Sequence, residues 1–333
     1  MGKRSMPETS PDAGSHVSVL LDEVLAAFEP LAGKRIVDGT FGAGGYSRAL
    51  LEAGAIVIGI DRDPSVQKFA DVLMAEFEGR FMFVPGTFSQ LDTLAAEHGP
   101  IDGVVLDIGV SSMQLDQAER GFSFMREGPL DMRMSGQGQS AADLVNTLDV
   151  EPLANLLYAF GEERKSRRIA QFIVAARETA PITTTTELAK IVERAIGRKP
   201  GDMHPATRTF QALRIAVNGE FEQLVEALFA AERLLDEGGR LVVVSFHSLE
   251  DRIVKRFFDP EKGGPAQSRH MPHVHAEPLR WVEVAKARKP GSAEIDRNPR
   301  ARSSILRAAT RSPDPARAVR FEGLGVPKVR GSE

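Results

Sequence analysis

Side chains that could bind a ligand or carry a proton stand at the ends of four short apolar runs in the first third of the chain. They are Asp38, Asp61, Phe88 and Asp107. Apolar runs that alternate with amphipathic segments predict parallel strands joined by helices. Because the carboxyl ends of parallel strands form the edge at which ligands bind, we expect these four side chains to converge there.

The segment 37–47, VDGTFGAGGYS, follows the first run and precedes a helix-like segment. Glycines allow positive φ and close approach of a ligand, and the N-terminus of the next helix offers free N–H groups. Gly42, Gly44 and Gly45 lack the spacing of a dinucleotide fingerprint, and Asp38 would repel a pyrophosphate. The turn therefore favours a ligand with an amino group, such as S-adenosylmethionine (SAM). The alternative is an ordinary strand–helix loop.

Two further positions fit a nucleoside. Asp61 lies 23 residues after Asp38, where nucleotide-binding sheets place a carboxylate that accepts the ribose hydroxyls. A helix cap before Pro64 is the alternative, but it does not explain this spacing. Phe88 is placed to flank adenine, unless it is a core aromatic residue at a helix start.

The composition excludes several classes of protein. With 333 residues, of which 42% are hydrophobic, the chain can form two domains or one enlarged domain. It has no cysteine, which excludes disulfides and thiolate metal sites. No apolar run reaches the roughly 18–20 residues that cross a bilayer, and the polar N-terminus does not resemble a signal peptide. We expect a cytoplasmic protein without membrane contact.

Charge is unevenly distributed along the chain. The net charge is −4, but residues 279–333 hold 13 basic and 6 acidic residues, which leaves 29 basic and 40 acidic residues elsewhere. A basic C-terminal segment on an acidic body is a candidate phosphate contact, although a solvated tail would have the same composition.

Strand and helix patterns predict an α/β protein with a doubly wound parallel sheet and a helical insertion. The strand pattern stops after the fourth run and resumes with a Val-rich run at 238–245. Two later runs, 279–284 and 303–307, could complete the sheet as a hairpin. The predicted divisions are a flexible N-terminus at 1–15, a sheet domain at 16–114 and 220–310, a helical insertion at 115–219 and a loose basic tail at 311–333.

Longer blocks of sequence carry a family resemblance. They read DIGVSSMQLD at 107–116, ERGFSF at 119–124, GPLDMR at 128–133, HPATRTFQALR at 204–214, SFHSLEDR at 245–252 and NPRARSS at 298–304. Together with the glycine turn, these blocks closely resemble the RsmH (MraW) family of bacterial SAM-dependent methyltransferases. The resemblance covers about residues 16–307.

The resemblance implies a class I SAM-methyltransferase fold, which is Rossmann-like, with an inserted helical domain for substrate recognition. It implies methylation of N4 of the cytosine at position 1402 in 16S rRNA, within the assembled small ribosomal subunit. By matching position, the residues that bind SAM would be Gly44, Gly45, Tyr46, Asp61, Phe88, Asp107 and Gln114. Tyr46 stands where the family often has histidine, and Met113 where it often has proline. A tyrosine is compatible with backbone contacts at position 46.

Two residues are candidates for catalysis. The N4 lone pair of cytosine is delocalised into the ring, so a hydrogen-bond acceptor at the amino group would help to remove a proton. Asp107 could bind the cofactor, accept from N4, or do both. His247, beyond the fifth run, could lie near the target base. The alternative for this block is a cap from Ser245 or Ser248 with Glu250 in the first helical turn.

Contacts with rRNA would come from basic and aromatic residues outside this site. The basic candidates are Arg164, Lys165, Arg167, Arg168, Arg208, Arg214 and the tail. Phe122 and Phe124 could stack a base, or pack in the core. We expect no metal site, because His270, His273 and His275 lie in a Pro/Gly-rich stretch with no partnering carboxylate motif, which favours a solvated loop.

Three other functions stay open. The first is a SAM-dependent methyltransferase of another nucleic acid or of a protein, although residues 107–110 lack the Pro-Pro-aromatic block of the usual DNA amino methyltransferases. The second is a nucleotide-dependent oxidoreductase, which the glycine spacing disfavours. The third is a non-catalytic RNA-binding factor of the same fold. The sequence does not indicate an oligomeric state.

Overall fold

The computed structural model describes residues 18–198, 201–258 and 278–329. Seven strands form one sheet in the order β3-β2-β1-β4-β5-β7-β6. The strands are β1 Arg35–Asp38, β2 Ile56–Asp61, β3 Phe81–Pro85, β4 Ile101–Asp107, β5 Leu235–Ser245, β6 Trp281–Val282 and β7 Ile305–Arg311. The first five are parallel, and β7 is antiparallel to both of its neighbours. This sheet confirms the predicted doubly wound α/β fold, including the final hairpin.

Side chains from the central strands alternate between two buried clusters. On β4, Val104 and Leu106 belong to one cluster, whereas Val105 belongs to the other. On β5, Val243 and Val242 divide in the same way. Because both faces of the sheet are covered, the strands read as continuous apolar runs, which is why they are visible in the sequence.

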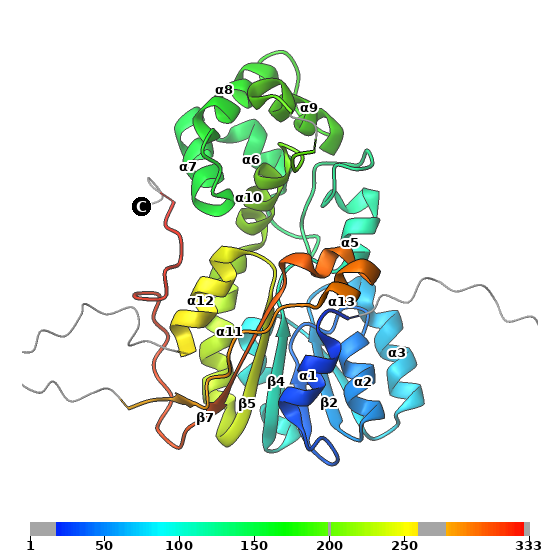
Figure 1. Cartoon of the computed structure of the whole chain (residues 1–333). Coiled ribbons are helices and arrows are strands. Elements are labelled where there is room, and N and C mark those ends of the chain that lie inside the picture. The colour runs from blue at the N-terminus through cyan, green and yellow to red at the C-terminus, as the bar shows by residue number, and fades with distance from the viewer. Residues whose placement is uncertain (1–17, 199–200, 259–277, 330–333) are drawn as a thin grey trace, which may run out of the picture.

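Helices cover each face of the sheet (Figure 1). Helices α1 Leu21–Phe28, α2 Gly45–Glu52 and α3 Gln67–Glu76 pack on one face. Helices α4 Leu91–Ala95, α11 Glu220–Leu234 and α12 Ser248–Phe258 pack on the other. Two short 3₁₀ turns flank α4, η2 Phe88–Gln90 before it and η3 Ala96–His98 after it.

A group of helices lies beyond the carboxyl edge of the sheet, in the upper part of Figure 1. It comprises α6 Ala141–Thr147, α7 Val150–Gly161, α8 Ser166–Arg177, α9 Thr185–Ile196 and α10 Thr207–Asn218, with the short α5 Ser112–Asp116 below it. Thr184 caps α9 by accepting the Glu187 N–H at 3.3 Å. Gly219, with φ 57°, ends α10 before α11 begins, so the two are separate helices.

The C-terminal segment was expected to be a loose tail, and the structure corrects this for its described part. Arg317 forms an ion pair with the fully buried Glu232 of α11. Its guanidinium also lies 5.3 Å from the Phe229 ring centroid and 4.7 Å from that of Phe257. Leu324 is buried as well. The composition indicated a solvated tail because it shows how many charges the segment has. It does not show that the buried carboxylate of Glu232 compensates the charge of Arg317.

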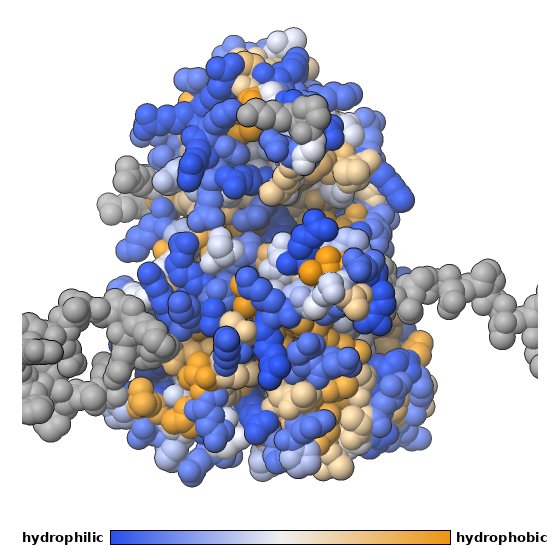
Figure 2. Space-filling view, in the orientation of Figure 1, coloured by the Kyte–Doolittle hydropathy of each residue, from blue (hydrophilic) through white to orange (hydrophobic). Residues whose placement is uncertain are grey.

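The surface is hydrophilic over most of the face in Figure 2, and its larger apolar patches lie in the lower half, over the sheet domain. Among the helices in the described ranges, none is both long and apolar enough to cross a membrane. The division into domains stays a prediction, as does the flexible N-terminus, whose residues lie outside the described ranges.

Candidate active site

The glycine turn after β1 has the positive φ angles that its glycines allow. Gly42 has φ 54°, and Gly44, which precedes α2, has φ 79°. A Cβ on Gly44 would lie 2.9 Å from the Phe41 ring, and a Cβ on Gly45 would lie 2.0 Å from Ser18 Oγ. Both positions therefore require glycine, because the conformation or the available space excludes a side chain.

Asp38 was expected to face a ligand, and the structure corrects this. Its side chain is fully buried and accepts hydrogen bonds from Ser47 Oγ at 2.7 Å and from the Thr40 N–H at 3.2 Å. Burial raises the pKa of Asp38 to about 6. Asp38 therefore holds the turn together from inside. Its position at the strand end indicated the correct edge, but the sequence does not show in which direction the side chain points.

Asp61 links this turn to the loop after β2. Its Oδ2 accepts the Gly42 N–H at 2.8 Å, and its Oδ1 accepts the Asp63 N–H at 2.8 Å. Burial raises the pKa of Asp61, although these two N–H groups oppose the shift. Each carboxylate oxygen has a second lone pair, so Asp61 keeps the capacity to accept further hydrogen bonds from a ligand.

Phe88 begins η2, just past β3, and is half-buried against the core. It lies beside the first turn: a Cβ on Gly39 would be 3.5 Å from Phe88 Cβ and 2.6 Å from Leu106. The ends of β1, β3 and β4 therefore meet at one place, as predicted from the strand ends. A partly exposed ring at this place is consistent with a flat ligand group packing against it.

Asp107 is the most unusual carboxyl group at this edge. Its backbone N–H donates to Thr40 Oγ1 at 2.7 Å, which ties β4 to the glycine turn. Its Oδ1 is buried and has no hydrogen-bond partner among the described residues. Burial, together with the charges of Asp38 and Glu250, raises the pKa of Asp107 to about 8. A buried acceptor without a donor is costly, so this atom is suited to a ligand N–H or cation.

Gln114 and Tyr46 form hydrogen bonds within the protein. Gln114 forms a capping box with Ser111, and its Nε2 donates to Asp63 Oδ2 at 2.9 Å. The Tyr46 hydroxyl donates to the Val19 carbonyl, and the ring is buried. The Tyr46 side chain is therefore directed into the core, which leaves the backbone as its means of contact with a ligand.

One ion pair at this site, between Arg120 and Asp63, was not predicted from the sequence. Arg120 donates to Asp63 Oδ2 at 2.9 Å and to the carbonyl oxygen atoms of Arg133 and Met134 at 3.2 and 2.9 Å. Burial alone would raise the pKa of Asp63, but hydrogen bonds from Gln114 and Ser65 and the charge of Arg120 hold it below its ordinary value. The only feature of the sequence that pointed to this pair was Asp63, the second aspartate of the block DRDP at 61–64.

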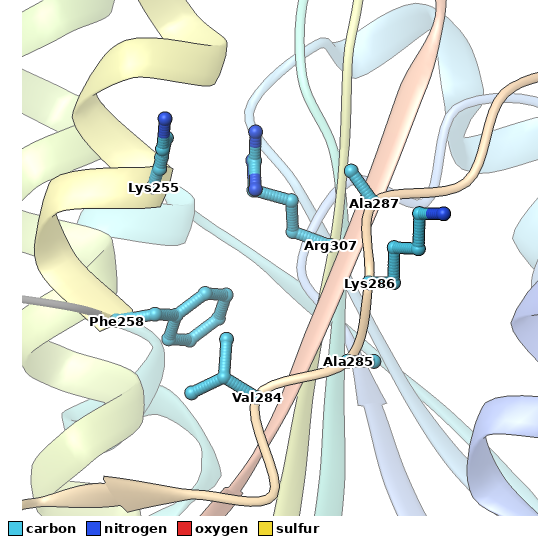
Figure 3. A pocket seen from close by; sticks show the side chains of 7 residues that line it. All are labelled: Lys255, Phe258, Val284, Ala285, Lys286, Ala287 and Arg307. Atoms are coloured by element: carbon cyan, nitrogen blue, oxygen red, sulfur yellow. The ribbon is translucent and has the colours of Figure 1, made fainter.

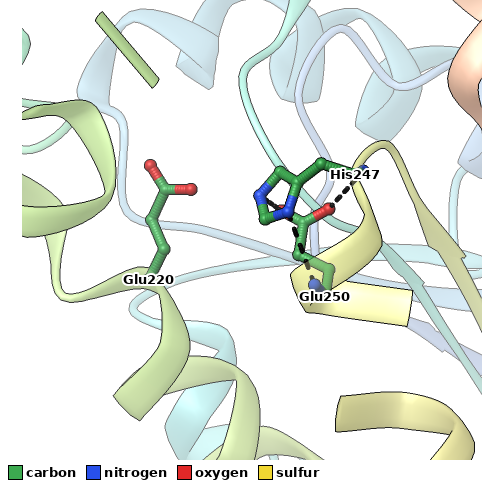
Figure 4. Close-up of side chains that lie close together, drawn as sticks. All are labelled: Glu220, His247 and Glu250. Atoms are coloured by element: carbon green, nitrogen blue, oxygen red, sulfur yellow. Dashed lines mark hydrogen bonds and ion pairs between the residues drawn. The ribbon is translucent and has the colours of Figure 1, made fainter. Parts of the chain in front are cut away.

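His247 lies at the same edge, because Asp107 pairs with Val244 of the neighbouring strand, three residues before it. His247 Nε2 is 2.9 Å from Glu250 Oε1, and Glu250 Oε2 accepts the His247 N–H at 3.3 Å (Figure 4). Glu250 Oε2 also accepts the Phe246 N–H at 2.9 Å. Burial would raise the pKa of Glu250, but the contacts of His247 and the charge of Arg214 hold it below its ordinary value. Glu250 thus lies in the first turn of α12, as the alternative interpretation had it. The expected serine cap is replaced by His247, whose Nδ1 accepts the Glu250 N–H at 3.4 Å, whereas Ser245 and Ser248 donate to Ile305 and Glu162.

Glu220, His247 and Glu250 bring three potential metal-ligand atoms within 4.8 Å of one another (Figure 4). However, Arg214 already binds both oxygen atoms of Glu220 at 2.8 Å. Its guanidinium also interacts with Glu250, so the buried acids have a cation without a metal. We assign the cluster a structural role. Arg214 is thereby removed from the candidates for phosphate contacts, and the three histidines at 270–275 lie outside the described residues.

The aromatic candidates for base stacking pack within the protein. Phe122 is buried in the core. Phe124 is partly buried, with its ring centroid 4.5 Å from that of His204 and 4.8 Å from that of Phe210. Core packing, the alternative considered for both residues, therefore describes them in this structure.

Comparison with known proteins supports one family. A sequence profile described as the MraW methylase family matches residues 13–312. The chain is 57% identical over 328 residues to the ribosomal RNA small subunit methyltransferase H of Cereibacter sphaeroides, which covers 97% of this chain and 98% of that protein. It is also 57% identical over 313 residues to the protein of that name from a Caulobacter species, covering 93% and 97%. The chain belongs to the MraW methylase family.

Proposed function

We propose that this protein transfers the methyl group of SAM to N4 of a cytosine in 16S rRNA of the small ribosomal subunit. Family membership over nearly the whole chain supports this function, since the curated relatives are named as small-subunit rRNA methyltransferases. The structural observation that carries it is Asp107 Oδ1, a buried acceptor without a donor among the described residues, at the carboxyl edge of the sheet. The cytosine is the one at position 1402 that the sequence resemblance implies.

The residues at the edge fit a bound SAM molecule. The turn, with positive φ at Gly44 and with Gly45 at the start of α2, brings backbone close to the ligand, and Tyr46 contributes through its backbone. Asp61 accepts the ribose hydroxyls, and Phe88 packs against adenine. Gln114 has one amide hydrogen beyond its bond to Asp63, which is available to the ligand or to Ser111. SAM supplies an electrophilic methyl group on a positively charged sulfur.

Asp107 serves both the cofactor and the reacting amine. A nearby sulfonium charge favours the ionised form of the carboxyl group, so it opposes the effect of burial on the pKa of Asp107. The carboxylate then accepts a hydrogen bond from the cytosine amino group and localises its lone pair. The bond from N4 to the methyl group would form as the methyl–sulfur bond breaks, so that the sulfur leaves as a neutral thioether, and Asp107 would receive the proton that N4 loses. Alignment of N4 with the methyl–sulfur bond supplies much of the remaining rate.

The substrate must present an unstacked base, because a base within a helix cannot reach this edge. We assign recognition of the surrounding RNA to the helices of residues 115–219, which lie directly beyond the site (Figure 1). His247 lies beside the target base and acts by shaping the site through Glu250. The assembled small subunit, in the cytoplasm, is the proposed substrate, since a site spread over folded RNA forms only there.

The test is methyl transfer from labelled SAM to small ribosomal subunits that lack the modification, followed by mass spectrometry of the nucleosides. We expect N4-methylcytidine at one site, and slower transfer to free 16S rRNA. Label in another nucleoside or in protein would favour the alternative, a SAM-dependent methyltransferase with a different substrate. SAM binding without any transfer would indicate a non-catalytic role.

A further inference from the structure

A cavity of about 250 Å³ lies beside α12, outside the site described above (Figure 3). It is formed by the C-terminal half of α12, by β7 and by the extended segment 284–287. The residues that line it are Lys255, Phe258, Val284, Ala285, Lys286, Ala287 and Arg307. Three of these seven are cationic and none is acidic, so the cavity is suited to an anionic ligand.

Two of the three cations are available to a ligand. Lys255 and Lys286 are exposed, and neither makes a hydrogen bond or ion pair within the described parts of the chain. Arg307 is held in place by Asp251, with Nε–Oδ1 and Nη2–Oδ2 distances of 2.7 and 3.0 Å. The surroundings thus combine one fixed guanidinium, whose charge is compensated, with two uncompensated ammonium groups. Phosphate oxygen atoms are the natural partners of such groups.

The remaining wall of the cavity is apolar. Phe258 and Val284 lie together on one side in Figure 3. The Phe258 ring is held edge-on against Trp281, with centroids 5.3 Å apart and an interplanar angle of 70°. Phosphate-binding cations next to an apolar surface match the two parts of a nucleotide. The volume is below the roughly 300–1,000 Å³ of ordinary small-molecule clefts, so it suits one unit of a chain better than a whole cofactor.

The cavity lies within reach of the proposed active site. Helix α12 begins at Ser248, directly after His247, and Lys255 is seven residues further on. At 1.5 Å per residue, this separation along the helix is about 10 Å. On β7, Ile305 pairs with Ser245 at the site edge, and Arg307 is two residues away. A single strand of RNA that placed one base at Asp107 could therefore continue to the cavity.

We propose that this cavity binds a nucleotide of the rRNA that neighbours the target cytosine. Lys255 and Lys286 contact its phosphate, and the exposed Val284, which lies beside the buried Phe258, packs against its sugar or base. The inference rests on the proposed function and adds to it a second point of contact with the substrate. Holding the strand at two points strengthens binding of the substrate, and it explains why unpaired lysines line a partly apolar cavity.

The experiment compares the full-length wild-type protein with the K255A/K286A double variant. Affinity for small subunits is measured at several salt concentrations, with methyl transfer followed in parallel. Each lost phosphate contact to single-stranded RNA lowers the slope of log affinity against log salt by about 0.7, and both lysines contact the same phosphate, so we expect a decrease of about 0.7. We also expect about tenfold weaker binding at physiological salt, with an unchanged Kd for SAM and unchanged kcat at saturating subunits. The K255R/K286R variant should recover most of the slope.

The matched control is Lys68→Ala, an exposed lysine on α3, which should leave the slope unchanged. A double variant with the wild-type slope would overturn the proposal. Binding of cytidine monophosphate is measured as well. If the double variant loses this binding but keeps the wild-type salt slope for subunits, the cavity is a site for free nucleotides and the proposal is overturned. If the wild-type protein binds subunits without methylating them, the proposed function fails while the salt slope still tests the cavity.

Discussion

Arg120 and Asp63 form an ion pair of 2.9 Å between two loops that follow different strands of the sheet. Asp63 is 4% exposed, so its carboxylate depends on Arg120 and Gln114 for its charge compensation. Arg120 also donates to two carbonyl groups at the entrance to the helical region. One guanidinium therefore connects the loop after Asp61 with the first residues that lead to the helices of the proposed RNA-recognition region.

We expect Arg120→Ala to reduce both stability and cofactor affinity. Removal of one partner leaves a buried carboxylate without its cation, which costs about 3 kcal/mol. The Asp61 loop would lose its fixed position, so the Kd for SAM should rise as well. Thermal unfolding and SAM titration measure the two effects. Arg300→Ala serves as the control, because its pair with Asp116 is about half exposed and should contribute at most about 1 kcal/mol.

Asp107→Asn should slow methyl transfer much more than it weakens SAM binding. The amide has a similar shape but is a poor proton acceptor, so we expect kcat to fall by about 10²–10⁴-fold, with a change in the Kd for SAM of less than about tenfold. Single-turnover transfer to small subunits gives the chemical rate directly. Asp102→Asn, at the opposite end of the same strand, should keep its kcat. Wild-type kcat in the Asp107→Asn variant would remove this carboxyl group from the mechanism.

The pH dependence of kcat/KM for SAM should show the raised pKa of Asp107. Burial raises this pKa to about 8 in the free protein. Because the reaction needs the carboxylate, kcat/KM should rise with pH and level off above about 8. In the complex, the sulfonium charge lowers the pKa of Asp107, so kcat should level off at a lower pH than kcat/KM. Identical profiles for the two constants would show that the carboxyl group does not interact with the cofactor.

The same carboxyl group should lower the stability of the ligand-free protein at alkaline pH. The folded pKa of Asp107 lies above the unfolded value of 3.8, so the folded state retains a proton that the unfolded state has lost. The free energy of unfolding therefore falls as pH rises from about 4 to about 8. Asp107→Asn removes this term, so its Tm should exceed that of the wild type by a few °C at pH 8 and match it near pH 4. Equal Tm differences at both pH values would contradict this account.

Gly44→Ala should disturb the proposed cofactor site more than a positive φ alone explains. Gly44 has φ 79° and closely neighbours Phe41 and Leu73, whereas Gly33 has φ 76° with nothing within 4 Å of an added Cβ. Gly33→Ala therefore measures the conformational cost, about 1–2 kcal/mol. Any loss of stability or of SAM affinity in Gly44→Ala beyond that in Gly33→Ala is due to crowding of the new Cβ against Phe41 and Leu73. Equal effects of the two substitutions would show that crowding at Gly44 is unimportant.

Much of the fold was predictable because both faces of the sheet are buried. The strand ends at Asp61, Phe88 and Asp107 could be aligned from apolar runs alone, since parallel strands share one edge. The direction of the Asp38 side chain was not predictable, because it depends on Ser47 and Thr40 in the folded turn. The pairing of Asp63 with Arg120, 57 residues later, likewise depends on tertiary structure. Local patterns therefore located the site. They did not show that Asp38 and Asp63 are bound within the protein, whereas Asp61 and Asp107 can accept hydrogen bonds from a ligand.

The position of β7 has a consequence for synthesis of the chain. This strand is the last of the seven in the sequence, yet it lies between β5 and β6 in the sheet. Ser245 at the end of β5 donates to the Ile305 carbonyl, which is synthesised 60 residues later. At about 5–20 residues per second, β5 leaves the ribosome with one unpaired edge for roughly 3–12 s. Open strand edges readily pair with other chains. The nascent protein therefore keeps an open strand edge until Ile305 and the residues after it are available, and truncation ahead of Ile305 would make that exposure permanent.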